Sequence, residues 1–337
     1  MVTVATSLPL FSRPGPLRDL VIDRGWQTLY VSESSQPAPS EVTYFICGTA
    51  KLDAAFFAAM PALKLVAMFG VGVDHIDLTA ATRHGVLVTN APGGNTRCVA
   101  ELALSLMLDL AHRVTEMHTN LATGVWRPRM GSELAGKTLG IVGLGHIGQL
   151  VAAMGKALGM KVIAANRNPK PEVIRRLGIA QLSLTDVLKQ SDFLSLHIPG
   201  GPESWHFGPA EFAAMKKSAF FINTARGDLV NLDALVNALE SKHLAGAGLD
   251  VFPAEPMDPG HRIFSLPQAV FTPHAGAMSL ESWHRVTSSC LEEIERILAR
   301  KRSPHACNPK VYESPTWAGF TMPLSPSPPG TNGAPSV

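Results

Sequence analysis

The sequence predicts an α/β fold of the doubly wound type, and three observations lead to this class. Short runs of β-branched, aromatic and other apolar residues alternate with longer helical stretches along most of the 337 residues. The runs are apolar throughout, as expected for parallel strands whose sheet is covered by helices on both faces. A glycine-rich segment links one of these runs to the helix that follows it. The length is sufficient for two domains, each with its own core.

The predicted strands follow one another along the chain with helical stretches between them. Each strand is short and lacks the alternation of a half-exposed strand, so we expect burial on both faces. The runs are VTYFI (42–46), LVAMF (65–69), VLVT (86–89), LGIVG (139–143), KVIAA (161–165), FLSLHI (193–198), AFFIN (219–223), GLDVF (248–252) and VFT (270–272).

One predicted helix, RCVAELALSLMLDLAHRV (97–114), carries apolar side chains around nearly its whole circumference. The main exceptions are Glu101, Ser105 and Asp109. A helix of this kind must be buried on all sides. It either lies between the domains or packs on a second subunit, and the two interpretations are compatible. The second interpretation favours a homodimer.

Composition and charge argue against several classes of partner. The chain is 46% hydrophobic and 17% charged, and its formal net charge of +2 is not gathered into basic tracts. We therefore do not expect nucleic acid or an anionic membrane as a partner. We expect a small-molecule ligand instead. The N-terminal stretch does not resemble a secretion signal, and no segment approaches 18 uninterrupted apolar residues, so we expect a cytoplasmic protein.

The four cysteines, Cys47, Cys98, Cys290 and Cys307, are far apart in the sequence. They lack the paired spacing that builds zinc sites or redox pairs. We expect reduced, partly buried thiols and no metal site.

The C-terminal residues differ in composition from the rest of the chain. The stretch ending in LSPSPPGTNGAPSV is rich in Pro, Ser and Gly. Such a segment buries too little apolar surface to offset the entropy lost on ordering, so residues 311–337 are predicted to form a flexible tail.

The glycine-rich segment GLGHIG has the G-x-G-x-x-G spacing of a dinucleotide-binding turn between a strand (139–143) and a helix (149–158). The first glycine permits the tight turn, the second lets the backbone approach a pyrophosphate, and the third lets helix and strand pack closely. The helix N-terminus then faces the phosphate charge. The expected cofactor contacts here are Gly143, Leu144, Gly145, His146, Ile147 and Gly148.

The residues after the next strand bear on which nucleotide binds. An Asp or Glu at the end of this strand would accept hydrogen bonds from the ribose hydroxyls of NAD. Here Asn166 stands in that place, followed by Arg167 and then by Lys170. A neutral Asn tolerates a 2′-phosphate and an Arg can bind it with paired, charge-assisted bonds. The sequence favours NADP(H), with NAD(H) remaining possible.

Three later segments place an ionisable residue after a predicted strand. They contain Arg226 in FFINTARGDLV, Asp250 and Glu255 in GAGLDVFPAEP, and His274 in VFTPHAGA. Open α/β sheets bind ligands at the carboxyl ends of their strands, so these side chains are candidates for one site.

With these segments the chain resembles the D-2-hydroxyacid dehydrogenases, in the branch of the glyoxylate and hydroxypyruvate reductases. The resemblance covers about residues 40–310 and consists of motifs in the family's order. They are GVGVDHIDL (70–78), NAPGGNT and VAE (within 90–101), GLGHIG (143–148), LHIP (196–199), NTARGDLV (223–230), GAGLDVFPAEP (246–256) and TPHAG (272–276).

The resemblance implies a role for each matching residue. His274 matches the general acid that protonates the 2-oxo oxygen, and Glu255 matches the carboxylate that orients it and favours its protonated form. Arg226 matches the residue that holds the substrate carboxylate and polarises the carbonyl. Asp250 matches the partner of the nicotinamide carboxamide. Further positions that match the cofactor lining are Pro199, Thr224, His274 and Gly276.

The resemblance also implies roles in the first domain. Val71 and Gly72 match the loop whose backbone amides receive the substrate carboxylate, and Val71 also matches a cofactor contact. His75 stands where the family often has Asn, so it is either a core or helix-entry residue or a replacement whose role is open.

The family's topology implies a nucleotide-binding domain inserted into a discontinuous substrate domain, both Rossmann-like. The expected ranges are 1–95 with 277–310 for the flavodoxin-like substrate domain and 96–276 for the nucleotide domain. The active site would lie in a cleft between them that closes by hinge motion.

The leading functional prediction is NADPH-preferring reduction of a small 2-oxo acid, of the glyoxylate or hydroxypyruvate type, to the D-2-hydroxy acid. Glu255 argues against formate dehydrogenase activity, because the formate dehydrogenases of this family carry Gln at this position. Oxidoreduction of D-3-phosphoglycerate or of 2-ketogluconate stays open within the family. A different class, a nucleotide-sensing scaffold similar to the C-terminal-binding corepressors, would bind nucleotide with little turnover.

Overall fold

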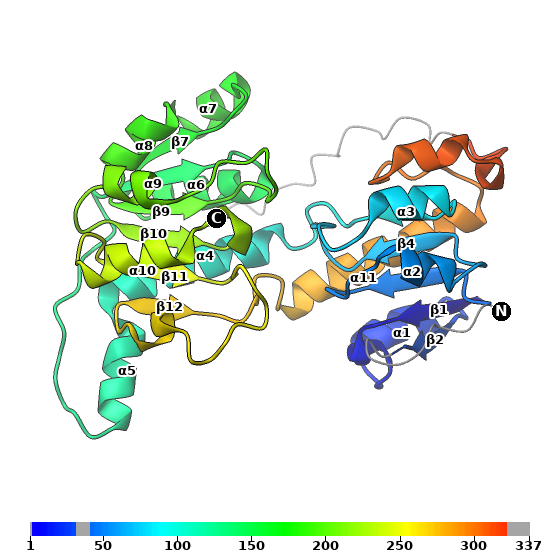
Figure 1. Ribbon diagram of the computed structural model, residues 1–337, viewed down its shortest axis with the longest axis horizontal. Helices are drawn as coiled ribbons and strands as arrows, with labels where there is room; N and C mark the ends of the chain where they lie inside the picture. The colour runs from blue at the N-terminus through cyan, green and yellow to red at the C-terminus, as the bar shows by residue number, and fades with distance from the viewer. Residues whose placement is uncertain (1, 32–40, 322–337) are drawn as a thin grey trace, which may run out of the picture. The chain divides into compact units, whose positions relative to one another are not determined.

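The structure is a computed structural model that describes residues 2–31 and 41–321. The chain divides into two compact units (Figure 1). Unit 1 comprises Met1–Gly94 and Trp283–Val337, and unit 2 comprises Asn95–Ser282. The chain thus leaves unit 1, builds unit 2 and returns. Residues 277–282, which the sequence assigned to the discontinuous domain, belong to unit 2.

Unit 1 contains a parallel sheet of five strands in the order β2-β1-β3-β4-β5. This is the strand order of flavodoxin-like sheets. Helices on both faces bury the sheet, with α11 contributing Cys290, Leu291 and Ile294 to one of its two clusters of buried side chains. The strands are β1 (Thr3–Thr6), β2 (Gln27–Tyr30), β3 (Tyr44–Cys47), β4 (Leu65–Met68) and β5 (Leu87–Thr89), and the helices are α1 (Pro16–Ile22), α2 (Ala54–Ala58), α3 (Leu78–Arg83) and α11 (Leu280–Leu298). The first three residues of α11 belong to unit 2 and the rest to unit 1.

Unit 2 contains a parallel sheet of seven strands in the order β12-β11-β10-β9-β6-β7-β8. The order reverses between β6 and β9, which is the switch point where open sheets of this type bind ligands. The strands are β6 (Thr138–Val142), β7 (Lys161–Ala165), β8 (Ala180–Gln181), β9 (Phe193–Leu196), β10 (Phe220–Asn223), β11 (Gly246–Leu249) and β12 (Ala269–Phe271). The helices are α4 (Thr96–His112), α5 (Val114–Ala122), α6 (His146–Ala157), α7 (Pro171–Leu177), α8 (Leu184–Gln190), α9 (Pro209–Ala214) and α10 (Leu232–Glu240).

The predicted α/β class with two doubly wound sheets is confirmed. Every run quoted from the sequence overlaps a strand of one of the two sheets. Three strands were not predicted, namely β1, β2 and β8.

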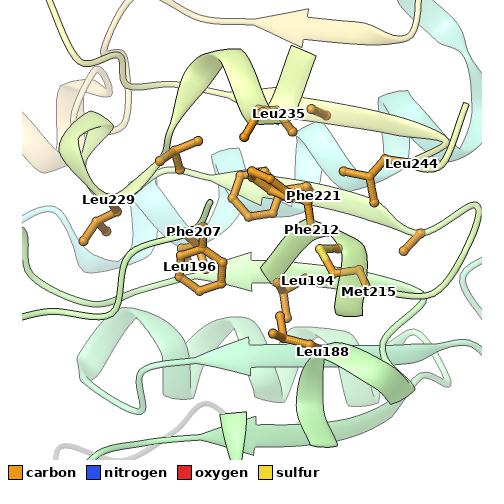
Figure 2. Packing of buried hydrophobic residues seen from close by; sticks show 14 of the residues in the cluster. Leu188, Leu194, Leu196, Phe207, Phe212, Met215, Phe221, Leu229, Leu235 and Leu244 are labelled. Carbon is orange, nitrogen blue, oxygen red and sulfur yellow. The ribbon is translucent and has the colours of Figure 1, made fainter. Parts of the chain in front are cut away.

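One face of the unit 2 sheet is covered by a cluster of leucine and phenylalanine side chains (Figure 2). Phe221 of β10 meets Phe212 of α9 edge to face, with ring centroids 5.2 Å apart. Phe207 and Leu229 lie on the same side of this cluster and precede α9 and α10. Burial of each large apolar side chain contributes about 1.5–3 kcal/mol, so these contacts fix the loops that leave the strands.

The apolar helix of the sequence is α4, and it is only partly buried within the chain. Seven of its residues are buried, including Ala103, Leu106 and Leu110, which pack toward the sheet. Leu108 is exposed on another side of the helix. The expectation of burial on all sides is therefore not met within this chain.

The C-terminal residues that the structure describes are packed on unit 1. Short 3₁₀ helices cover Pro309–Glu313 and Pro315–Trp317, and Val311 and Trp317 are buried. The indole N–H of Trp317 donates to the carbonyl oxygen of Gly85 at 2.9 Å. The prediction of a flexible tail is wrong for residues 311–321, because Val311 and Trp317 are buried there and the Pro- and Ser-rich composition belongs to the residues that follow. Residues 322–337 lie outside the described residues.

Candidate active site

The glycine-rich turn lies at the switch point of unit 2, between β6 and α6. Gly143 has φ of +100°, and a methyl group there would lie 2.4 Å from the carbonyl oxygen of His197. A methyl group on Gly148 would lie 1.9 Å from the carbonyl oxygen of Gly143. Both positions therefore require glycine. The helix begins at His146, so Gly148 lies in its first turn and not before it, and the predicted start at residue 149 was too late.

This turn can accept a dinucleotide. Gly145 caps α6, is exposed, and has no atom within 4 Å of where a side chain would begin. The first N–H groups of a helix have no acceptor within the helix and carry partial positive charge, which suits a pyrophosphate. His146 is exposed beside them, whereas the side chain of Leu144 is buried. The hydroxyl of Thr224, after β10, is buried without a hydrogen-bond partner among the described residues.

Asn166 braces the glycine-rich turn. Its Oδ1 accepts the backbone N–H of Leu144 at 2.9 Å, and its Nδ2 donates to the carbonyl oxygen of Asn168 at 2.7 Å. The amide is thus engaged at both ends by the protein. Arg167 follows directly and is exposed. Asn166 therefore holds the chain that presents Arg167, a relationship that the sequence did not reveal.

His274 and Glu255 form a close pair. The Nδ1 atom of His274 lies 2.6 Å from Oε2 of Glu255, and the other oxygen of Glu255 accepts the backbone N–H of Phe252 at 2.8 Å. Glu255 follows β11 and His274 follows β12, so adjacent strands present the two side chains. His274 has φ of +52°, a left-handed conformation in which few residues other than glycine are found. Its backbone N–H is fixed by the carbonyl oxygen of Asp250 at 2.8 Å.

The electrostatics of the pair favour a protonated imidazole. The hydrogen bond that the ring donates to Glu255 and the nearby negative charges raise the pKa of His274, although burial and the charge of Arg226 oppose this. Burial acts to raise the pKa of Glu255, but the bonds from His274 and Phe252 together with the nearby positive charges outweigh it, and the pKa is lowered. Arg226 is thus close enough to act on both members of the pair. His197, by contrast, stays neutral because burial lowers its pKa to about 3.

Asp250 organises the loop that carries His274. The carboxylate is buried and accepts three hydrogen bonds, from the hydroxyl of Thr272 (2.6 Å) and from the backbone N–H groups of Ala275 (2.6 Å) and Gly276 (2.9 Å). Burial raises the pKa of Asp250, and these bonds offset part of that rise. Thr272 was not singled out from the sequence, although it lies within the quoted TPHAG motif.

Arg226 lies in a tight loop after β10. The buried side chain of Asn223 closes this loop by accepting the N–H of Ala225 at 3.0 Å and donating to the carbonyl oxygen of Arg226 at 2.8 Å. A methyl group on the next residue, Gly227, would lie 1.9 Å from the carbonyl carbon of Phe252. The loops bearing Arg226 and Glu255 are therefore in direct backbone contact. Sequence reasoning missed Asn223 and Gly227, which the NTARG motif contains.

The remaining predicted residues divide between the units. In unit 2, Pro199 is exposed in the segment that follows β9. In unit 1, Val71 and Gly72 lie in the loop after β4, where the carbonyl oxygen of Val71 accepts the side-chain N–H of Asn90 at 2.7 Å. His75 in the same loop accepts the backbone N–H of Leu52 at 3.0 Å through its carbonyl oxygen. The structure brings Arg226, Asp250, Glu255 and His274 together within unit 2.

Comparison with known proteins assigns the family. The model of the D-isomer specific 2-hydroxyacid dehydrogenase NAD-binding domain matches residues 104–276. This chain belongs to that family. The members of this family are oxidoreductases of small 2-hydroxy and 2-oxo acids, and the glycine-rich turn lies in the NAD-binding domain.

Relatives within the 2-hydroxyacid dehydrogenases carry more than one name. A glyoxylate reductase of Aeropyrum pernix is 40% identical over 276 residues, which are 79% of this chain and 82% of the relative. A D-3-phosphoglycerate dehydrogenase of Mycobacterium leprae is 42% identical over 260 residues, which are 76% of this chain but 49% of the relative. The chain thus spans about half the length of that dehydrogenase. The structure of D-lactate dehydrogenase from Aquifex aeolicus, in complex with NAD and lactic acid, has a TM-score of 0.77 at 28% identity, covering 88% of this chain and 95% of that one.

The described residues contain neither a cluster of metal ligands nor a disulfide bond. Within 2–31 and 41–321, no group of three or more His, Cys, Asp or Glu side chains could hold a metal ion. The four cysteines are free, with Cys47 and Cys290 buried. Among the helices of the described chain, none has the length and apolar character needed to cross a membrane.

Proposed function

We propose that this 2-hydroxyacid dehydrogenase reduces a small 2-oxo acid of the glyoxylate or hydroxypyruvate type, with NADPH preferred over NADH. The observation that carries the proposal is the pair of His274 and Glu255, held 2.6 Å apart beside Arg226. This arrangement combines a proton donor with a guanidinium, which are the two groups that a 2-oxo carboxylate requires of the protein.

The proton comes from His274. Nδ1 is directed at Glu255, so Nε2 is the atom left to face a substrate. When bound, the reduced nicotinamide supplies a hydride to the carbonyl carbon. Nε2 of the imidazolium donates its proton to the carbonyl oxygen, which gives the 2-hydroxy acid and a neutral imidazole. The other ring proton stays on Nδ1, hydrogen-bonded to Glu255. Glu255 does not transfer a proton, and it stabilises the charged form of the ring.

The substrate carboxylate is bound by charge and by backbone. We assign the guanidinium of Arg226 to it, because the planar fork matches two carboxylate oxygens and the positive charge also polarises the neighbouring carbonyl. The backbone N–H groups of Val71 and Gly72 are proposed as further donors. Arg226 is kept in place by Asn223 and by the contact of Gly227 with Phe252.

The nucleotide preference follows from Asn166 and Arg167. Both ends of the Asn166 amide are bonded within the protein, and no carboxylate stands there to repel a 2′-phosphate. Arg167 is exposed next to it and provides the positive charge. The pyrophosphate is assigned to the first turn of α6. NAD(H) remains a second cofactor, as the NAD in the related D-lactate dehydrogenase illustrates.

Initial rates with a panel of 2-oxo acids test the proposal. We expect NADPH consumption with glyoxylate and hydroxypyruvate to exceed that with 3-phosphohydroxypyruvate and 2-ketogluconate. Higher rates with 3-phosphohydroxypyruvate or 2-ketogluconate would assign that acid as the substrate instead, within the same family. Tight nucleotide binding with no turnover of any acid would instead indicate a nucleotide-sensing scaffold.

Arg226→Lys provides the matched test of the carboxylate site. We expect a higher KM for the 2-oxo acid and a lower kcat, because an ammonium group cannot form the paired bonds of a guanidinium. Arg175→Lys is the control, since Arg175 is an exposed residue of α7 paired with Glu172. Normal kinetics in Arg226→Lys would exclude the guanidinium clamp.

A further inference from the structure

Residues 197–207 follow β9 and connect two parts of the candidate site in unit 2, the glycine-rich turn and the loop of Arg226. We refer to these residues as the crossing segment. At its start it touches the glycine-rich turn, since a methyl group on Gly143 would lie 2.4 Å from the carbonyl oxygen of His197 and 2.7 Å from a side-chain carbon of Ile198. At its end the N–H of Phe207 donates to the carbonyl oxygen of Leu229 at 2.7 Å. The crossing segment therefore lies between the phosphate turn and the loop of Arg226.

Asp228 holds the middle of the crossing segment. Its Oδ2 accepts the backbone N–H of Gly201 at 2.9 Å. The approach is close, because a methyl group on Gly200 would lie 2.8 Å from Oδ1 of Asp228 and 3.1 Å from Cγ of Arg226. Asp228 thus joins the crossing segment to the residues next to Arg226.

His206, near the other end of the crossing segment, also contacts both Asp228 and Gly201. Its Nδ1 lies 3.2 Å from the carbonyl oxygen of Asp228, and its Nε2 lies 3.2 Å from the carbonyl oxygen of Gly201. Carbonyl oxygens only accept hydrogen bonds, so each contact requires an N–H from the ring. A neutral imidazole satisfies one of them and an imidazolium satisfies both.

The crossing segment also has an internal tie. The hydroxyl of Ser204 donates to the carbonyl oxygen of Pro199 at 2.6 Å, and the N–H of Ser204 donates to the carbonyl oxygen of Gly201 at 3.1 Å. Residues 199–204 therefore form a compact turn. Displacement of Gly201 would be transmitted to Pro199 and from there to the residues against Gly143.

We propose that Asp228 and His206 are positioning residues that hold the crossing segment against the dinucleotide turn and the Arg226 loop. They act through backbone atoms and do not touch substrate. The inference rests on the proposed function, because the ligands affected are the dinucleotide and the 2-oxo acid. A purely structural tie would instead change the mobility of the segment without changing ligand binding.

The test compares Asp228→Ala with Asp228→Asn in the full chain. The alanine variant loses the acceptor for Gly201, whereas the asparagine variant keeps a side-chain oxygen there. Asp233→Ala is the control, because Asp233 pairs with Arg262 at the surface of α10 in the same unit. The measurements are hydrogen exchange of peptides covering 197–207, the dissociation constant of NADPH from fluorescence titration, and KM and kcat for glyoxylate.

For Asp228→Ala we expect faster exchange in the crossing segment and a dissociation constant raised about three- to tenfold, which is the range for the loss of one ordinary hydrogen bond. Asp228→Asn should restore most of the affinity, and Asp233→Ala should behave as the wild type. His206→Ala should act in the same direction, and the double variant should lose less than the product of the single losses, because both residues hold the same backbone.

Two results would overturn the proposal. Unchanged exchange in Asp228→Ala would show that the carboxylate does not hold the segment. If Asp228→Ala exchanges faster but keeps the wild-type affinity for NADPH and the wild-type kinetics, the contact stabilises the segment without affecting ligand binding. If the wild-type protein binds no dinucleotide, the proposed function fails separately, and the exchange data still decide whether Asp228 fixes the segment.

Discussion

The ring of His274 and the carboxylate of Glu255 are joined by a hydrogen bond of 2.6 Å between Nδ1 and Oε2. The bond selects one tautomer of the neutral ring and leaves Nε2 for a substrate. It also raises the pKa of His274 above its ordinary value. An acid with a raised pKa remains protonated at higher pH, where a reduction that consumes a proton would otherwise slow.

Glu255→Gln is predicted to change the pH dependence of reduction. With a protonated His274 required, kcat/KM is high below the pKa of His274 and falls as the pH rises through it. Removing the carboxylate charge lowers this pKa, so the descending limb should move to lower pH. Glu172→Gln, at an exposed ion pair of α7, is the control. If the descending limb of the kcat/KM profile of Glu255→Gln lies at the same pH as in the wild type, a group other than His274 determines that limb.

Asp250→Ala is predicted to destabilise the loop that carries His274. The substitution leaves the hydroxyl of Thr272 and the N–H groups of Ala275 and Gly276 without their acceptor. Losing buried partners of this kind costs about 2–4 kcal/mol of the free energy of unfolding. Denaturant unfolding measures this, with Asp258→Ala as the surface control. A loss below 1 kcal/mol, as is usual for surface substitutions, would mean that the loop is held without Asp250.

Arg167→Ala is predicted to weaken binding of NADPH selectively. The loss of charge-assisted bonds to a 2′-phosphate should raise the KM for NADPH about tenfold or more, while the KM for NADH stays within about twofold. Adding Asn166→Asp should move the preference further toward NADH, since Asp keeps the oxygen that accepts from Leu144 but brings a negative charge. An unchanged ratio of the two KM values would place the 2′-phosphate elsewhere.

A homodimer is predicted from the apolar side chains around α5, which stands out from the rest of unit 2 (Figure 1). Leu121 at the end of α5 and Trp126 and Met130 in the loop after it are 53%, 87% and 91% exposed, and a contiguous exposed apolar patch would be typical of an interface. Sedimentation velocity should give a dimer for the wild type and a monomer for Leu121→Glu combined with Trp126→Glu. Leu298→Glu, at an exposed leucine of unit 1, should remain dimeric. A monomeric wild type at tens of micromolar would contradict the prediction.

The sequence predicts every strand except β1, β2 and β8, because the others coincide with continuously apolar runs. The strand β1, TVAT, lies inside its sheet, but two of its four residues are threonine. The strand β2, QTLY, is partly exposed at a sheet edge and carries polar residues, and β8 has only two residues. Neither leaves a pattern of hydrophobicity. The helix α6 begins earlier than predicted because its first turn contains a glycine, which helix propensity disfavours but close packing against Gly143 requires.

The candidate site is predictable in its residue types and not in its internal bonds. Arg226, Glu255 and His274 were found because they follow strands and match family motifs. The contacts of Asp250 with Thr272 and of Asn166 with Leu144 join segments about 22 residues apart, partly through backbone atoms. Backbone N–H groups carry no sequence signal, so only the structure reveals what these side chains hold.

The most direct test of the proposed chemistry is the single-turnover rate of NADPH oxidation by glyoxylate in His274→Ala, compared with the wild type by stopped flow. We predict that the rate falls by about two to four orders of magnitude, as for the loss of a general acid, while the dissociation constant of NADPH changes little. A rate within a few-fold of the wild type would contradict the assignment of His274 as the proton donor.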